Sequence, residues 1–228
     1  MKLASLLSGG KDSLYATYLV MKEGHEVKYL ITMVPDRQDS YMFHKPCIEF
    51  TKLQAESLGI KQIMCATKGE KEKELEDLVK VLSGIAEEID GVVSGALASN
   101  YQKSRIDRIC EELGLESIAP LWQADQLERL KEEVKEGFEI IITAVAAEGF
   151  DESWLGRVLG EDAISDLENM HKRFGIHIGG EGGEYETFVL NCPLFRNKIN
   201  FVETKKIWDK KTSSGYLKVK NAELVDKD

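Results

Sequence analysis

Residues 8–13 read S-G-G-K-D-S, and this segment connects a short apolar run at residues 2–7 to an amphipathic pattern that ends near Gly24. The apolar run is typical of a buried strand, and the amphipathic pattern is typical of a helix. A glycine-rich turn between a strand and a helix presents backbone N–H groups and the positive end of the helix dipole to an anion. The segment therefore predicts a phosphate-binding loop, formed by Ser8, Gly9, Gly10, Lys11 and Ser13.

The aspartate in this loop, Asp12, separates it from two common nucleotide-binding patterns. If Gly10 and Lys11 are placed on the G-K of the Walker A pattern, Ser5 replaces its first glycine and Asp12 replaces its final Ser or Thr. The G-x-G-x-x-G pattern of dinucleotide-binding proteins is also absent. A carboxylate here can hold the Mg²⁺ that accompanies ATP, and we expect this role for Asp12. The alternative is a glycine-rich turn whose serine caps a helix.

Beyond the loop, strand-like and helix-like patterns alternate up to about residue 122. The predicted strands are residues 27–34, 60–66, 91–94 and 117–119, and the predicted helices are residues 48–58, 71–88 and 100–113. Gly59 and Gly114 follow two of the helices, as helix-ending glycines do. This order predicts an α/β domain over residues 1–122, with a parallel, doubly wound nucleotide-binding sheet covered by helices on both faces.

The pattern changes near residue 123, and the rest of the chain predicts a smaller domain. Helices are expected at residues 123–136 and 161–174, and a strongly apolar strand is expected at residues 137–147. Shorter β-like runs follow at residues 186–190, 198–207 and 216–224. We predict a mixed α+β domain over residues 123–228, and we expect it to carry the substrate-binding surface.

Composition limits the classes of function that are possible. The chain has 228 residues, with 40 acidic and 30 basic side chains and a formal net charge of −10, which argues against stable nucleic-acid binding. No apolar stretch approaches the roughly 20 residues that cross a bilayer, so we expect no membrane segment. The four cysteines are widely spaced and form no C-x-x-C pair. They are typical of reduced thiols in a cytoplasmic protein.

Two further segments place polar and aromatic side chains near predicted strand ends. Residues 40–44 read S-Y-M-F-H, in which Tyr41 and Phe43 would share one face of an extended chain and could hold a base or a quaternary ammonium. The alternative is that they pack beneath a loop, with His44 an ordinary polar residue. Residues 94–108 read S-G-A-L-A-S-N-Y-Q-K-S-R-I-D-R. Tyr101 and Arg105, at i and i+4, would lie on one helix face, where an open parallel sheet binds ligands.

Ser99 and Gln102 have the spacing of a capping box, which would by itself explain both residues. The third segment, residues 181–187, reads E-G-G-E-Y-E-T. If this segment is extended, Glu184 and Glu186 face the same side, and carboxylates so close repel unless a cation lies between them. With Glu181 they would form a cluster for Mg²⁺, ammonium or a trimethylammonium group. The alternative is a solvated hairpin tip.

Taken together, S-G-G-K-D-S, S-Y-M-F-H, S-G-A-L-A-S-x-Y-Q-x-x-R and E-G-G-E-Y-E-T resemble the diphthine–ammonia ligase family. This family is a branch of the ATP pyrophosphatase (PP-loop) superfamily, whose loop has the form S-G-G-x-D-S. The resemblance extends from the first predicted strand to about residue 195. It implies a nucleotide-binding sheet of the HUP-like, adenine nucleotide alpha hydrolase-like type.

The resemblance also implies a reaction and its participants. ATP would adenylate the carboxylate of diphthine, a modified histidine of translation elongation factor 2, and ammonium would supply the nitrogen of the amide, with AMP and pyrophosphate as products. ATP and Mg²⁺ are the expected cofactors. The expected catalytic residues are Lys11, Asp12, Glu184 and Glu186. The expected substrate-binding residues are Tyr41, Phe43, His44, Gly95, Ser99, Tyr101, Gln102, Arg105 and Glu181.

Two alternative functions remain open at this point. A tRNA-modifying ATP pyrophosphatase would share the loop, although the acidic balance of the chain speaks against it. A non-catalytic protein that binds adenine nucleotides would also share the sheet, but it gives the segment E-G-G-E-Y-E-T no evident purpose. The sequence also leaves open the formation of a homo-oligomer.

Overall fold

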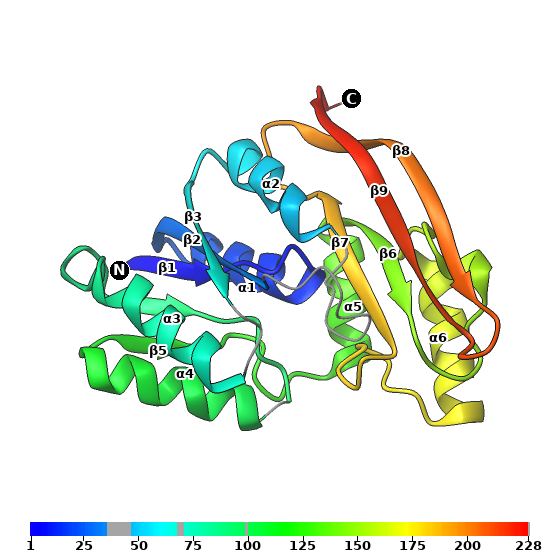
Figure 1. The fold of residues 1–228 in the computed structure, drawn as a ribbon, viewed down its shortest axis with the longest axis horizontal. Helices are drawn as coiled ribbons and strands as arrows, with labels where there is room; N and C mark the ends of the chain where they lie inside the picture. Colours follow the sequence, from blue (N-terminus) through cyan, green and yellow to red (C-terminus); the bar gives the residue numbers. More distant parts are fainter. Residues whose placement is uncertain (36–46, 68–70, 99, 228) are drawn as a thin grey trace. The chain divides into compact units, whose positions relative to one another are not determined.

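The first part of the chain forms a five-stranded parallel sheet (Figure 1). The computed structural model describes residues 1–35, 47–67, 71–98 and 100–227. The strands of this sheet are β1 (Lys2–Leu6), β2 (Glu26–Pro35), β3 (Lys61–Thr67), β4 (Gly91–Val93) and β5 (Glu116–Ile118). Their order is β3-β2-β1-β4-β5, and each neighbouring pair runs parallel. The α-helices between them are α1 (Lys11–Lys22), α2 (Thr51–Leu58), α3 (Lys71–Ser83) and α4 (Asn100–Leu113).

Helices cover both faces of this sheet. Side chains alternate between the two faces of a strand, so Ala4 and Ser5 of β1 point to opposite sides. Ala4 belongs to a buried cluster that includes Leu78 of α3 and Ile106 of α4. On the other face, the hydroxyl of Ser5 lies 2.8 Å from the hydroxyl of Thr17 in α1. The prediction of a doubly wound α/β sheet is therefore confirmed.

The second part of the chain has a separate sheet of four strands. Its elements are α5 (Gln126–Lys135), β6 (Glu139–Val145), α6 (Glu161–Phe174), β7 (Tyr185–Asn191), β8 (Lys198–Asp209) and β9 (Ser214–Val225). The strand order is β7-β6-β9-β8, and all the pairs are antiparallel. The helices α5 and α6 bury Leu130 and Leu167, and the sheet buries Ile140 and Phe188. This mixed α+β fold is the architecture that the sequence predicts for the C-terminal part.

The chain divides into two compact units. The first unit contains Met1–Ser8 and Asp12–Gln123, and the second contains Gly9–Lys11 and Ala124–Asp228. Three residues of the glycine-rich loop are thus grouped with the C-terminal part of the chain. Within the residues described, none of the helices has the length and apolar content that crossing a membrane requires.

Three predicted helix boundaries are wrong: the helix expected at residues 48–58 begins at Thr51 after a 3₁₀ turn at Ile48–Phe50, and the other two differ for local reasons. The helix expected at residues 71–88 ends at Ser83, because Gly84 follows and the N–H of Ile85 turns back to the carbonyl of Leu82. A separate 3₁₀ turn then covers Ala86–Glu88. The helix expected from residue 123 begins at Gln126. Asp125 caps it there by accepting a hydrogen bond of 2.9 Å from the Glu128 N–H.

Candidate functional site

The glycine-rich loop lies at the point where the strand order of the parallel sheet reverses. From β1 the chain continues to β2 and β3 on one side, whereas β4 and β5 lie on the other side. Loops that follow the two central strands leave in opposite directions, and open α/β sheets bind ligands in the crevice between them. The segment S-G-G-K-D-S follows β1, and the segment S-G-A-L-A-S follows β4. Strand topology therefore brings these two predicted motifs to one sheet edge.

Gly95 of the second motif lies directly against the start of α1. A Cβ atom at Gly95 would be 2.7 Å from the carbonyl carbon of Asp12 and 2.8 Å from the backbone nitrogen of Ser13. Both of these atoms belong to the backbone, so no side-chain rotation can relieve the overlap. A glycine is required at this position for the two motifs to approach so closely.

Ser5, Thr17 and Ser13 form a chain of hydrogen bonds beside the loop, which we call the hydroxyl ladder. The hydroxyl of Thr17 donates to the carbonyl of Ser13 at 2.7 Å, and it also lies within hydrogen-bond distance of Ser5. The backbone N–H of Ser8 donates to the hydroxyl of Ser13 at 3.3 Å. Gly9 has a φ of 86°, a left-handed conformation that glycine adopts without steric cost. The loop conformation is thus fixed by its own serines and by the sheet.

The helix after β4 brings together two of the predicted binding residues. The guanidinium carbon of Arg105 lies 3.3 Å from the ring centroid of Tyr101, and its Nη1 donates to the carbonyl of Tyr101 at 3.4 Å. The expectation that these residues share a helix face is confirmed. Tyr101 is 46% exposed, whereas Arg105 is only partly exposed and its Nε is buried. Gln102 is part of α4, but its side chain is outside the described part of the structure.

Other predicted residues fall outside the described ranges. Ser99 is one of them, and Tyr41, Phe43 and His44 are the others. Their predicted roles therefore stay predictions.

The buried hydroxyl of Ser94, at the start of the second motif, has no hydrogen-bond partner among the described residues. Such a group is suited to receive a bond from a ligand at this sheet edge.

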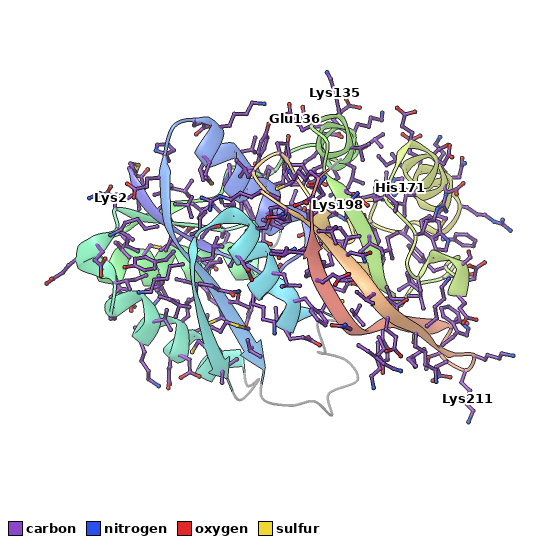
Figure 2. The ribbon with its side chains drawn as sticks, turned by 90° about the horizontal axis from the view of Figure 1, so that it is seen from above. Lys2, Lys135, Glu136, His171, Lys198 and Lys211 are labelled. Carbon is purple, nitrogen blue, oxygen red and sulfur yellow. The ribbon has the colours of Figure 1, made fainter. Side chains whose placement is uncertain are left out.

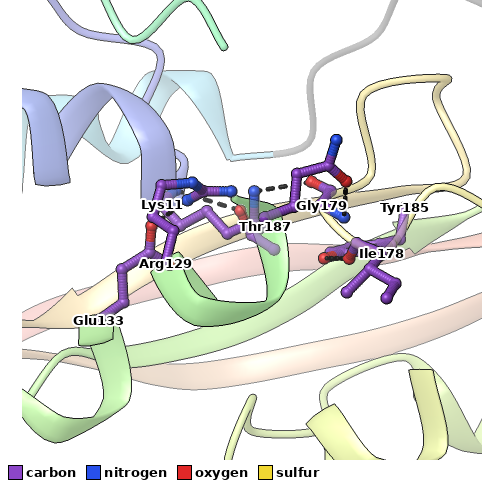
Figure 3. Close-up of polar contacts among 8 residues, drawn as sticks. Lys11, Arg129, Glu133, Ile178, Gly179, Tyr185 and Thr187 are labelled. Carbon is purple, nitrogen blue, oxygen red and sulfur yellow. Dashed lines mark hydrogen bonds and ion pairs between the residues drawn. The ribbon is translucent and has the colours of Figure 1, made fainter. Parts of the chain in front are cut away.

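Lys11 makes its principal contacts within the second unit (Figure 3). The side chain is 2% exposed, and its ammonium donates to the carbonyl of Gly179 at 2.8 Å. Its backbone N–H donates to the hydroxyl of Thr187 at 3.2 Å, and the ring of Tyr185 lies 5.9 Å from the ammonium. The N–H of Val189 in β7 also donates to the carbonyl of Gly9 at 3.0 Å. These contacts fix the loop backbone and the lysine to β7 and the segment before it.

The sequence did not predict the cluster of polar side chains that lies around Gly179. The N–H of Gly179 donates to Oε1 of Gln126 at 3.2 Å, and the amide nitrogen of Gln126 contacts Nε2 of His177. One turn along α5, Arg129 forms an ion pair with Glu133, and their side chains are only 2% and 0% exposed. Opposite charges at i and i+4 normally lie on a solvated helix face, so the sequence pattern concealed this buried pair. His177 belongs to none of the recognised sequence motifs, so the sequence did not indicate a role for it.

The segment E-G-G-E-Y-E-T begins as a loop at residues 181–184 and ends within β7. Glu184 precedes this strand, and its carboxylate accepts hydrogen bonds from the N–H groups of His177 at 2.9 Å and Gly182 at 2.8 Å. Glu186 lies within β7 and is exposed. The expectation that Glu184 and Glu186 share one face of an extended strand is wrong, because backbone donors direct Glu184 into the loop. Glu181 is exposed on the same loop.

Burial lowers the pKa of His177 below its ordinary value of 6.5. The nearby carboxylate of Glu184 opposes this shift, whereas the positive charges of Lys11 and Arg129 add to it. The backbone N–H of Glu181 donates to Nδ1 of His177 at 3.3 Å, a bond that requires an unprotonated nitrogen. The neutral imidazole is therefore the form that this loop stabilises.

The donor groups near the loop fit Mg²⁺ only as a companion of ATP. Among the described residues there is no group of three or more His, Cys, Asp or Glu side chains that could hold a metal ion. Mg²⁺ commonly binds through one or two carboxylates together with waters and substrate phosphates. Asp12, in the first turn of α1, offers one carboxylate of that kind. A metal held by protein ligands alone does not fit the described residues.

A doubly wound parallel sheet with a glycine-rich loop at its switch point defines a nucleotide-binding α/β protein. Comparison with known families then shows which one it is. The diphthamide synthase N-terminal domain matches residues 1–117, and the diphthamide synthase C-terminal domain matches residues 126–225. The chain belongs to the diphthamide synthase family.

Individual relatives agree with this assignment. A diphthine–ammonia ligase from Rattus norvegicus is 38% identical over 220 residues, covering 87% of this chain and 82% of the relative. The Homo sapiens protein of the same name is 35% identical over 221 residues with the same coverage. The Schizosaccharomyces pombe protein of that name is 34% identical, and the match covers 96% of this chain but 39% of the longer relative. Separately from this assignment, a solved structure of a predicted subunit of tRNA methyltransferase from Methanocaldococcus jannaschii is 18% identical, with a TM-score of 0.47 and a match that covers 84% of this chain and 97% of that chain.

Replacing Gly95 tests the close approach of the two motifs. We expect Gly95→Ala to lower ATP affinity by about tenfold or more and the free energy of unfolding by about 1–3 kcal/mol, because the new methyl overlaps the backbone of α1. Calorimetric titration with ATP and denaturant unfolding measure the two effects. Gly160→Ala is the matched control, since a Cβ at Gly160 meets no atom within 4 Å. Equal effects in both variants would contradict the steric explanation.

The lowered pKa of His177 predicts a pH-dependent contribution to stability. Below the unfolded pKa of about 6.5, the unfolded chain binds a proton that the folded loop resists. The contribution of His177 is therefore complete above that pH and is lost as the pH falls through the folded pKa. Between about pH 7.5 and 5.5, the melting temperature of His177→Gln should fall less than that of the unaltered protein. Equal decreases would show that His177 titrates normally.

Proposed function

We propose that this protein converts diphthine on translation elongation factor 2 into diphthamide, using ATP and ammonium. The observation that carries this proposal is the match of both family domains along the chain, together with a glycine-rich loop at the switch point of the sheet. The relatives that share 35–38% identity are named diphthine–ammonia ligases. This family membership favours amidation over tRNA modification and over nucleotide binding without catalysis.

The reaction has two chemical steps. In the first, an oxygen of the diphthine carboxylate attacks the α-phosphorus of ATP, and pyrophosphate leaves to give an acyl-adenylate. In the second, ammonium loses a proton, and the ammonia nitrogen attacks the acyl carbon. The bond from that carbon to the AMP oxygen breaks, so the products are the amide and AMP. Catalysis requires stabilisation of the negative charge that develops on the two leaving groups.

The loop residues suit the first step. We assign Ser8, Gly9, Gly10 and Ser13 to the ATP phosphates, because backbone N–H groups and hydroxyls at a helix start favour anions. Lys11 supplies positive charge for the departing pyrophosphate. Its burial would strengthen that interaction, since charges act more strongly where water is excluded. Bound Mg²⁺ would neutralise phosphate charge, and Asp12 is the residue that would hold it.

The remaining residues are assigned to the acceptor and to ammonium. Tyr101, Gln102 and Arg105 at the start of α4 would position the diphthine carboxylate or the α-phosphate. Glu181, Glu184 and Glu186 would bind the trimethylammonium group or take the proton from ammonium. We further assign Gly95, Ser99, Tyr41, Phe43 and His44 to the substrate-binding surface. Residues 1–122 would then hold ATP and part of the substrate-binding surface, and residues 123–228 would provide the rest of that surface.

A reconstituted reaction tests the proposed function. The protein is mixed with ATP, ammonium and elongation factor 2 that carries diphthine, and AMP and the mass of the factor are measured. We expect AMP to form together with a mass loss of about 1 Da, as hydroxyl is replaced by amine. Lys11→Met, which keeps the buried aliphatic stem, should lower the rate by about 10²–10³-fold. Formation of ADP, or full activity of the variant, would overturn the assignment.

Glu186 provides a test that separates the two steps. Because Glu186 is exposed within β7 and lies outside the glycine-rich loop, Glu186→Gln should leave ATP affinity within about twofold while amidation falls at least about 10²-fold. ATP binding is measured by calorimetry and amidation by mass spectrometry. Glu223→Gln, which alters an exposed glutamate on β9, is the matched control. Equal loss of binding and amidation would indicate a structural role instead.

A further inference from the structure

The ammonium group of Lys11 lies in a small buried site of the second unit (Figure 3). Its Nζ donates to the carbonyl of Gly179 at 2.8 Å and lies 5.9 Å from the centroid of the Tyr185 ring. Lys11 and Tyr185 are only 2% and 4% exposed. A carbonyl oxygen and the face of an aromatic ring are two groups that attract an ammonium ion. The site is therefore built for a cation that carries N–H groups.

The carbonyl of Gly179 is held in place by the peptide that precedes it. The oxygen of that peptide, from Ile178, accepts a hydrogen bond of 2.6 Å from the Tyr185 hydroxyl. Its N–H, from Gly179, donates to Oε1 of Gln126 at 3.2 Å. Gly180 has a φ of 78°, and a Cβ there would lie 3.1 Å from the Tyr185 ring, so glycine is needed where the chain passes this ring. The carbonyl and the ring are thus positioned by contacts that do not involve the lysine.

The charges beside this site are balanced without the lysine. Arg129 is a neighbouring cation, because a Cβ at Gly179 would be 3.4 Å from its Nη2, and its guanidinium is ion-paired with Glu133. Burial of a further charge is costly, yet this unit already accommodates one ammonium group at this point. A free ammonium ion in the same position would have the same charge and the same kind of donor. The unit could therefore accept it without rearranging its other charges.

The role proposed for Lys11 requires its ammonium to leave this carbonyl. We assign Lys11 to the pyrophosphate that departs from ATP, and a hydrogen bond to a charged phosphate is roughly twice as strong as one to a neutral carbonyl. Once the lysine has turned to the phosphates, the Gly179 carbonyl is a buried acceptor without its donor, which costs free energy. The next reactant in the proposed reaction is ammonium. The exchange of one ammonium group for the other would couple ammonium binding to ATP binding.

The site distinguishes ammonium from the other candidates in the reaction. The trimethylammonium group of diphthine has no N–H, so it cannot donate to the Gly179 carbonyl. Water can donate, but it has no charge for the Tyr185 ring to attract. Mg²⁺ requires octahedral coordination by oxygen ligands, which a single carbonyl and a ring do not supply. Ammonium satisfies both the carbonyl and the ring.

We propose that the Gly179 carbonyl and the Tyr185 ring form the binding site for the ammonium that supplies the amide nitrogen, and that the Lys11 ammonium fills this site until ATP is bound. The identification of this ammonium as the nitrogen donor rests on the proposed function. Lys11 occupies the site in the absence of ATP and leaves it when phosphates are within reach. Ammonium therefore binds after ATP, and the site adds no covalent step to the reaction.

The first experiment removes only the ammonium group of Lys11. Methionine is one atom shorter than lysine, so Lys11→Met keeps most of the buried stem and empties the position of Nζ. The melting temperature of this variant should be about 2–4 °C higher in about 0.2 M ammonium chloride than in sodium chloride of equal concentration, because a ligand that binds only the folded state stabilises it. The unaltered protein should melt at the same temperature in both salts, since its own lysine occupies the site.

A matched control makes the same substitution at an exposed lysine. Lys135 lies in the last turn of α5, and Figure 2 shows it extending outward from that helix. Lys135→Met should melt at the same temperature in both salts. If Lys11→Met shows no difference either, the ammonium site is overturned. An equal stabilisation of Lys11→Met by potassium chloride would indicate a site for any monovalent cation and would overturn the assignment to ammonium.

The second experiment tests whether nucleotide opens the site in the unaltered protein. The α,β-methylene analogue of ATP cannot be cleaved between its α and β phosphates, and its binding is confirmed by calorimetry. With this analogue bound, ammonium chloride should raise the melting temperature by about 2–4 °C relative to sodium chloride. Without the analogue the two salts should act alike. The same rise with and without the analogue, or no rise with it, would overturn the exchange with Lys11.

The third experiment tests the ring by steady-state kinetics at varied ammonium. Tyr185→Leu should raise KM for ammonium about tenfold, with KM for ATP within about twofold, because the ring attracts the cation and is not among the groups assigned to ATP. Tyr185→Phe keeps the ring and should restore most of the ammonium affinity. Phe201→Leu, which removes a partly buried ring from β8, is the control for the loss of an aromatic side chain. Equal increases in both KM values would indicate a structural role instead.

The outcomes separate this proposal from the proposed function. The melting experiments need neither diphthine nor elongation factor 2, so they test the ammonium site alone. If the unaltered protein produces diphthamide and Lys11→Met shows no stabilisation by ammonium, only the ammonium site is overturned. If the unaltered protein produces no diphthamide, the proposed function fails, and the role of this site in supplying the amide nitrogen fails with it.

Discussion

The close approach of Gly95 to the backbone of Asp12 is the constraint on which the candidate site depends. Two loops at the carboxyl ends of neighbouring parallel strands are brought to atomic contact there, and a single methyl group would separate them. Asp12 and Ser13 belong to the first turn of α1, so the start of this helix packs against the loop after β4. The hydroxyl ladder of Ser5, Thr17 and Ser13 then holds the loop in that position.

A buried lysine forms the second organising interaction. The ammonium of Lys11 is bound by the carbonyl of Gly179, and the N–H of Gly179 is bound in turn by Gln126. The nearby pair of Arg129 and Glu133 is almost fully buried, and burying such a pair contributes little to stability because desolvation opposes the attraction. We infer that this network is retained because it fixes geometry. It makes the segment before β7 part of the surroundings of the glycine-rich loop.

Most of the fold could be predicted from local patterns, and much of the candidate site could not. Alternating strands and helices indicated a doubly wound sheet, and the i, i+4 spacing of Tyr101 and Arg105 indicated their shared helix face. The spacing of Glu184 and Glu186 was misleading, since a period of two predicts a shared face only inside a strand, and Glu184 lies before β7. Arg129 and Glu133 resembled an exposed pair because burial depends on what packs against a helix, which spacing does not reveal.

The sequence by itself determined the class of fold and the family. The fold class followed because strands, helix ends and glycine-rich turns depend on residue types over a few positions. The family followed because four short motifs occur in this chain in the order that the family has. The tertiary structure alone decided which motifs meet: strand order placed S-G-A-L-A-S against S-G-G-K-D-S, and β7 brought Thr187 to Lys11. The register of β8 and β9, which is likewise a tertiary feature, placed Lys205 opposite Lys218. These contacts join residues that are far apart in the chain, so no local pattern could specify them.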